Sequence, residues 1–339
     1  MNRLILVLLS QYQMNMKYIR LKGLVIFWCM SLLFVLNGMR IIAQPGSVKA
    51  NGISIAYESF GSKNDPAVIL IMGTGDTMLN WPVEFCEKLA AHGLRIIRFD
   101  NRDIGLSSKL DSLGQPDWTA IAPHIGKCDN APLPYTLLDM VKDVTGLMDA
   151  LHINNAHIAG VSMGGAIAQL MAINYPQRVI SLTSISATSG NPARDPGDEK
   201  AMAVMMTPAP VTDDPDTVVN YLVQVYKALG STDDLKTLQE RALNHFNRTW
   251  LPEAVNRQAA AVIVGDYCDR RADLAGIKIP ALVIQGDADP LVSPEAGKEV
   301  ADAIPGSELC IITGMGHDLS VEFIDEIADC IIKHINSIK

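Results

Sequence analysis

The chain has 339 residues, and 48% of them are hydrophobic, which is enough to build a large buried core. Its formal net charge is -9, and the sequence contains no run rich in lysine and arginine. Because nucleic-acid binding needs clustered cations opposite the phosphates, this composition argues against a nucleic-acid partner.

The N-terminal segment is typical of an export signal with a long hydrophobic part. Lys17, Arg20 and Lys22 precede an uncharged apolar run from Gly23 to Met39, and the small residue Ala43 stands just before a polar turn. We expect an exported protein, periplasmic or secreted, with cleavage near Ala43. The same run approaches the length of a membrane-spanning helix, so an uncleaved membrane anchor is the alternative.

The next segments predict a sheet that starts with a hairpin. Two alternating runs joined by Asn51-Gly52 predict an antiparallel pair. Apolar runs of strand length then alternate with amphipathic helical patterns, which predicts parallel strands covered on both faces. The fold class is therefore α/β, with a mostly parallel eight-stranded sheet. Its later strands are expected at 67–72, 94–99, 156–161, 179–185, 281–286 and 307–313.

The interval 188–272 breaks this alternation, because it contains helical patterns and no convincing strand. We expect a helical lid there, since ligands of open α/β sheets bind beyond the carboxyl ends of the strands. Met202, Met205 and Met206 suit an adaptable apolar pocket, although a methionine stripe is also typical of ordinary packing. The expected divisions are a signal or anchor, a first core part, the lid and a second core part, at 1–44, 45–187, 188–272 and 273–339.

A strand-to-helix turn carries the strongest chemical signal. The segment GVSMG, residues 160–164, fits the pattern G-x-S-x-G between an apolar strand and a helix-prone stretch. In that context the small residues permit a sharp turn that exposes the hydroxyl of Ser162. A neutral hydroxyl is a poor nucleophile, so it needs a base, and the base needs an acid that orients it.

The base and the acid are expected at the same edge of the sheet. Of the seven histidines, His317 alone lies in a glycine-bracketed loop directly after the last expected strand. The preceding strand ends in GDAD, which offers Asp287 and Asp289. The order of serine, acid and histidine, each just past a different parallel strand, is the arrangement of α/β hydrolases.

The chain also resembles the α/β-hydrolase family over nearly all of 46–339 outside the insertion, and most of all the branch that contains aclacinomycin methylesterase. The resemblance rests on the segments MGTGDTMLNWPVEF, RIIRFDNRDIGLSS, GVSMGG, GDADPLV and GMGHDL. It implies that Asp289, rather than Asp287, is the acid. The chain departs from the family pattern D-x-R-G-x-G-x-S at Asp103, which stands in place of a glycine.

An acyl-transfer site also needs N–H donors for the oxyanion of its tetrahedral intermediate. The residue after the nucleophile, Met163, supplies one. The resemblance implies Thr74 for the second, although Met72 stands where many relatives carry histidine. Trp81 is a candidate for the pocket mouth, with a core position as the alternative.

The cysteines give weaker signals. The set contains no CxxC pair, so a zinc site is poorly supported. Cys86 and Cys310 lie in apolar patterns and are expected in the core, whereas Cys128 and Cys268 lie in polar loops and are a candidate disulfide.

Together these features predict a serine esterase that cleaves a small, largely apolar ester through an acyl-enzyme, without cofactor or metal. Because the fold does not fix the substrate, hydrolysis of amide, lactone or carbon-carbon bonds is an alternative. A non-catalytic protein that binds small molecules on the same fold is the alternative from another class. The sequence gives no indication of oligomeric state.

Overall fold

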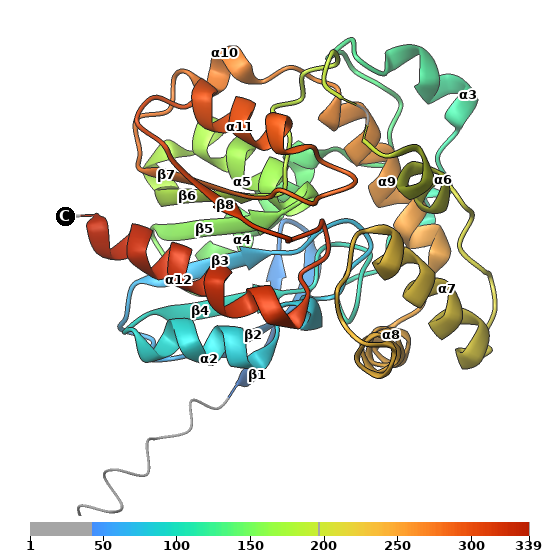
Figure 1. The fold of residues 1–339 in the computed structure, drawn as a ribbon, viewed down its shortest axis with the longest axis horizontal. Helices are drawn as coiled ribbons and strands as arrows, with labels where there is room; N and C mark the ends of the chain where they lie inside the picture. Colours follow the sequence, from blue (N-terminus) through green and yellow to red (C-terminus); the bar gives the residue numbers. More distant parts are fainter. Residues whose placement is uncertain (1–42, 196, 339) are drawn as a thin grey trace, which may run out of the picture. The chain divides into compact units, whose positions relative to one another are not determined.

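The computed structural model describes residues 43–195 and 197–338 (Figure 1). The expected signal or anchor, with its apolar run from Gly23 to Met39, lies outside the described residues. The chain from Ala43 onward forms one compact unit, and β1 begins at Gln44, the last residue of the expected signal segment. In this described part, no helix is both long and apolar enough to cross a membrane.

Eight strands form one sheet in the order β1-β2-β4-β3-β5-β6-β7-β8. Strand β2 pairs antiparallel with both β1 and β4, and all other neighbours pair in parallel. The predicted fold class is therefore confirmed. The strands are β1 (Gln44–Ala50), β2 (Ile53–Phe60), β3 (Ala67–Ile71), β4 (Arg95–Phe99), β5 (Ala156–Val161), β6 (Val179–Ile185), β7 (Ala281–Gly286) and β8 (Glu308–Ile312).

The turn and strand signals in the sequence account for these boundaries. Asn51 and Gly52 join β1 to β2 with φ angles of 48° and 81°, the left-handed conformation that a two-residue hairpin turn requires. The predictions for 156–161, 179–185 and 281–286 match β5, β6 and β7, and the other three exceed the observed strands by one residue at one or both ends. Strands β3, β4, β5 and β7 are buried along their whole length, because helices cover both faces.

Two layers of helices cover the sheet (Figure 1). Helices α2 (Val83–Ala91) and α12 (Val321–Ser337) pack on one face. Helices α4 (Leu137–Ala150), α5 (Met163–Asn174) and α11 (Pro294–Ala303) pack on the other. The remaining short elements are η1 (Met78–Asn80), η2 (Asp111–Leu113), α3 (Trp118–Ile121), η3 (Ala122–His124), η4 (Pro176–Arg178) and α10 (Arg271–Leu274).

The described residues of 188–272 contain helices and no strand. These are α6 (Glu199–Met205), α7 (Pro215–Ala228), α8 (Leu235–Arg248) and α9 (Pro252–Asp266), which Figure 1 shows gathered at one end of the sheet. Helices α7 and α8 share a small core of their own, which includes Val218, Leu222 and Leu238. We call the segment 188–272 the lid.

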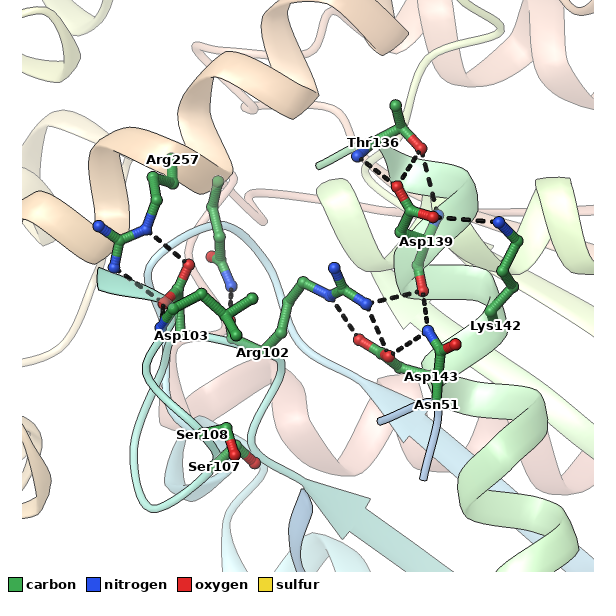
Figure 2. A network of polar contacts seen from close by, with 12 residues as sticks. Asn51, Arg102, Asp103, Ser107, Ser108, Thr136, Asp139, Lys142, Asp143 and Arg257 are labelled. Carbon is green, nitrogen blue, oxygen red and sulfur yellow. Dashed lines mark hydrogen bonds and ion pairs between the residues drawn. The ribbon is translucent and has the colours of Figure 1, made fainter. Parts of the chain in front are cut away.

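Buried ion pairs fix the loop after β4 (Figure 2). Arg102 donates to both carboxylate oxygens of Asp143 on α4, at 2.6 and 2.7 Å, and Asn51 donates to the same carboxylate at 2.9 Å. Arg257 on lid helix α9 donates twice to Asp103, at 2.9 Å each. The loop is therefore tied to the sheet's helical cover on one side and to the lid on the other.

The cysteines pair more extensively than expected. Cys128 and Cys268 form the candidate disulfide, which joins the segment after η3 to the end of the lid, and Cys86 is buried and free. Cys310 is bonded to Cys330 on α12, so its expected role as a plain core residue is wrong. The reason is that β8 is an edge strand that is only partly buried, and α12 packs against the face that carries Cys310, which brings Cys330 within bonding distance.

The pair between Arg257 and Asp103 yields a stability prediction. Both side chains are almost completely removed from solvent, so Arg257→Met leaves an uncompensated buried charge and should lower the free energy of unfolding by about 3–5 kcal/mol. The double variant Asp103→Gly/Arg257→Met should recover at least half of this loss, because glycine also suits the φ of 71° at residue 103. Urea unfolding measures both. A double variant no more stable than the single one would contradict the explanation.

Candidate active site

Ser162 lies at the tip of the turn between β5 and α5, in a strained backbone conformation with φ 55° and ψ -120°. The turn is tight because the surrounding backbone approaches closely. A Cβ on Gly160 would lie 2.0 Å from the carbonyl oxygen of Gly164, and one on Gly164 would lie 2.2 Å from that of Ile71. Glycine is thus required at both positions for the sharp turn that the sequence pattern predicts.

Asp289 and His317 follow β7 and β8, and the structure brings their side chains together. Nδ1 of His317 lies 2.9 Å from Oδ2 of Asp289. The backbone N–H groups of Leu291 and Val292 each donate to Oδ1 of Asp289 at 2.8 Å, which fixes the carboxylate. Asp287 instead accepts from the N–H of Gly314 at 2.6 Å, so the histidine pairs with the acid that the resemblance implies.

The charge environment of His317 favours its protonated form. Burial alone lowers the pKa of His317, but the negative charges of Asp289, Asp318 and Asp76 outweigh burial, and the pKa lies above its ordinary value of 6.5. A histidine held in this way is a strong base toward a proton that arrives during a reaction.

Ser162 and His317 line the same cavity, which has a volume of about 230 Å³. Thr74, on the loop after β3, lines it as well, and Met163 follows Ser162 at the start of α5 with its side chain buried. A Cβ on Gly73 would lie 3.4 Å from Cβ of Ser162, so this loop runs directly beside the serine. The structure thus brings the predicted triad and oxyanion residues to one place.

The lid contributes many of the apolar residues in the cavity wall. Met202, Met205 and Met206 all line the cavity, as the apolar-pocket interpretation of these methionines expects. The lid helix α9 adds Ala259, Val262 and Ile263.

The position of Trp81 differs from the expected one. In the described part of the chain, the cavity wall does not include Trp81, whose side chain is completely buried and stacks on Phe85 with ring centroids 5.2 Å apart. The expected substrate contact is therefore wrong at this residue, and its core alternative is confirmed. The physical reason is that α2 begins just after Trp81 and encloses its ring in the core.

Sequence reasoning missed a polar part of the cavity wall, formed by Asp76, Asn80, Arg241 and Asp318. Arg241 donates to both oxygens of Asp318 at 2.8 Å. Burial raises the pKa of Asp76 to about 6. Asp76 and Asp318 lie within two of the segments that carry the family resemblance, MGTGDTMLNWPVEF and GMGHDL, so those segments were the local indication of these two residues. Nothing local indicates Arg241, because only the packing of α8 brings it to the cavity.

A second polar part of the cavity wall contains Arg194 and Asp266, whose side chains form an ion pair at 3.0 Å. The guanidinium of Arg194 lies over the ring of Tyr267, which also lines the cavity.

Within residues 43–195 and 197–338, no group of His, Cys, Asp or Glu side chains is arranged to hold a metal ion.

Comparison of the sequence with known proteins finds relatives of this chain. The chain is 28% identical over 306 residues to rhodomycin D methylesterase DauP from Streptomyces sp. (strain C5), which covers 83% of this chain and 95% of that protein. It is 30% identical over 179 residues to Lipase 1 from Psychrobacter immobilis, which covers 52% of this chain and 54% of the lipase.

Solved structures show the same fold at lower sequence identity. The enol-lactonase from Burkholderia xenovorans LB400 superposes with a TM-score of 0.65 at 23% identity, over 86% of this chain and all of that one (100%). A meta-cleavage product hydrolase from Pseudomonas fluorescens IP01 superposes with a TM-score of 0.66 at 20% identity, over 88% of this chain and 99% of that one. The sequence family described as the alpha/beta hydrolase fold matches residues 66–323. The chain therefore belongs to the alpha/beta hydrolase fold family.

Proposed function

We propose that the protein is a serine esterase that cleaves a carboxylic ester of a small, largely apolar substrate. One observation carries the proposal: His317, hydrogen-bonded to Asp289, lines the same cavity as a serine held in a strained strand-to-helix turn. The likeness to a methylesterase and a lipase supports ester as the bond that is cleaved.

In the acylation step, Oγ of Ser162 attacks the ester carbonyl carbon while Nε2 of His317 accepts the hydroxyl proton. Asp289 holds Nδ1 of His317 and stabilises the imidazolium that forms. The backbone N–H groups of Met163 and Thr74 donate to the oxyanion. His317 then gives its proton to the departing alcohol, which leaves the acyl group on Ser162.

In the deacylation step, His317 removes a proton from a water molecule, which attacks the acyl carbonyl and forms a second tetrahedral intermediate. When this collapses, the proton returns to Oγ of Ser162 and the carboxylic acid leaves. Every proton in this cycle moves through His317, so the reaction requires neither a metal nor an organic cofactor.

We also propose that the protein is exported, either with cleavage near Ala43 or with the N-terminal segment kept as an anchor. The N-terminal pattern suggests this, and the two disulfides support it, because disulfides persist in oxidising compartments.

The first test concerns Ser162. Ser162→Ala should lower kcat for short p-nitrophenyl esters by about 10⁴- to 10⁶-fold, because the substitution removes the nucleophile. A fluorophosphonate probe should label Ser162 in the folded wild-type protein, and mass spectrometry of the exported protein locates both the label and the mature N-terminus. Retained hydrolysis in the variant would refute the mechanism. Ligand binding without labelling or turnover would favour a binding protein, and a preference for peptides or lactones would change the bond assigned.

The second test concerns pH. His317 must be neutral to accept a proton, so its raised pKa places the acid limb of kcat/KM above pH 6.5. Asp76→Asn removes a negative charge that favours the imidazolium, so the limb should move to lower pH. Asp149→Asn, an exposed carboxylate paired with Arg178, is the control and should leave the limb in place. A limb that is identical in all three proteins would contradict the contribution of Asp76 to the raised pKa of His317.

The third test concerns substrate charge. The cavity wall carries the carboxylates of Asp76, Asp266 and Asp318, while its two guanidinium groups are already paired. A carboxylate added to an aryl methyl ester should therefore lower kcat/KM by about tenfold or more relative to the matched neutral ester, because like charges face one another. Equal or faster hydrolysis of the anionic ester would show that an arginine is available to the substrate.

A further inference from the structure

The loop after β3 is bonded to the lid beside the site where the proposed function places the oxyanion. The backbone N–H of Gly75 donates to Oε1 of Gln258 at 2.8 Å, although the two residues lie 183 positions apart. Gln258 belongs to lid helix α9 and is completely buried. Gly75 directly follows Thr74, so this hydrogen bond fixes the peptide on the C-terminal side of the proposed donor residue.

The amide of Gln258 is held at both ends. Its Nε2 donates to the carbonyl oxygen of Arg102 at 2.8 Å, so its donor side and its acceptor side each have a defined partner. The loop that carries Arg102 is itself fixed by Asp143 of α4 and, through Asp103, by Arg257 of α9 (Figure 2). Gln258 therefore bridges two loops that are anchored elsewhere.

The packing around Gly75 gives the loop little room to move. Gly75 has a φ of +77°, and a Cβ there would lie 3.1 Å from Cγ1 of Val255, one helical turn before Gln258. Farther along, the N–H of Met78 donates to Oδ1 of Asp100 at 2.9 Å, and Arg248 of α8 pairs with the same carboxylate at 2.8 Å. Two lid helices thus restrain the segment 75–78 that follows the proposed oxyanion donor.

We infer that Gln258 is a positioning residue for the oxyanion hole. In the described chain it is not part of the cavity wall, whereas Gly73 and Thr74 are, so Gln258 acts on the reaction through the backbone of the loop. A donor that is held in place before the reaction needs no reorganisation when negative charge develops, and this is where its catalytic value lies. The lid is then a fixed part of the catalytic apparatus as well as a wall of the substrate cavity.

The inference rests on the proposed esterase function and predicts a specific kinetic pattern. Gln258→Met keeps the length of the side chain and removes the acceptor for Gly75. It should lower kcat by about 10- to 100-fold with KM within about twofold, because the donor contributes chiefly in the transition state. The inhibition constant of a boronic acid transition-state analogue should rise by a similar factor. Asn256→Met, at an exposed position of α9, is the matched control and should keep wild-type kinetics.

Hydrogen–deuterium exchange provides a readout that does not need catalysis. In folded Gln258→Met, the peptide that contains Gly75 should exchange faster than in the wild-type protein and the Asn256→Met control, because the N–H has lost its acceptor. Unchanged exchange, or an unchanged kcat with faster exchange, would overturn the positioning role. If the wild-type protein hydrolyses no ester, the proposed function is wrong, and faster exchange would still support the anchoring of the loop by the lid.

Discussion

The geometry of the site depends on one constraint, the positive φ of Ser162 at the end of β5. A non-glycine residue in this conformation is strained, and the strain persists because the surrounding structure holds the turn from several sides. The N–H of Ser162 donates to the carbonyl of Ile185 in β6, and its own carbonyl accepts from Ala166 within α5. The turn therefore directs the hydroxyl outward while the sheet and helix retain their hydrogen bonds.

The other residues of the site lie at strand ends for a related reason. Parallel strands bring their carboxyl ends to one edge, so the residues after β3, β5, β7 and β8 meet there although they are far apart in sequence. The Asp289–His317 pair is rigid because backbone N–H groups hold the carboxylate. The loop after β3 is held from two sides, because Asn101 of the core donates to the carbonyl of Met72 and the N–H of Gly75 donates to Gln258 of the lid.

Asp103 shows how the chain accommodates a departure from its family's pattern. The pattern has glycine at this position, which suits the φ of 71° observed here. An aspartate in the same conformation brings a charge into a buried region, and Arg257 from the lid neutralises it with two hydrogen bonds. Two residues far apart in the sequence thus form a single ion pair that attaches the lid to the core.

Much of the fold was predictable because it is encoded in local patterns. The turn at Asn51-Gly52 and the strands β5 to β7 follow from segments of a few residues. The local pattern left Asp287 and Asp289 both open as the partner of His317, and the family resemblance implied Asp289, which the structure pairs with His317. The expectations for Trp81 and Cys310 are wrong for a common reason. Whether a side chain reaches a cavity, the core or a disulfide partner depends on which helix packs against it. The bonds of Gln258 and Arg241 had no local signal at all.

The sequence by itself determined the order of elements and the chemical groups at the strand ends, because hydrophobic periodicity and turn residues act over short distances. Only the tertiary structure decided which lid residues support the oxyanion loop, which carboxylates surround His317 and which cysteines pair. These features depend on distances between segments separated by tens to more than a hundred positions, and the buried charges among them are tolerated only when the folded chain supplies a partner.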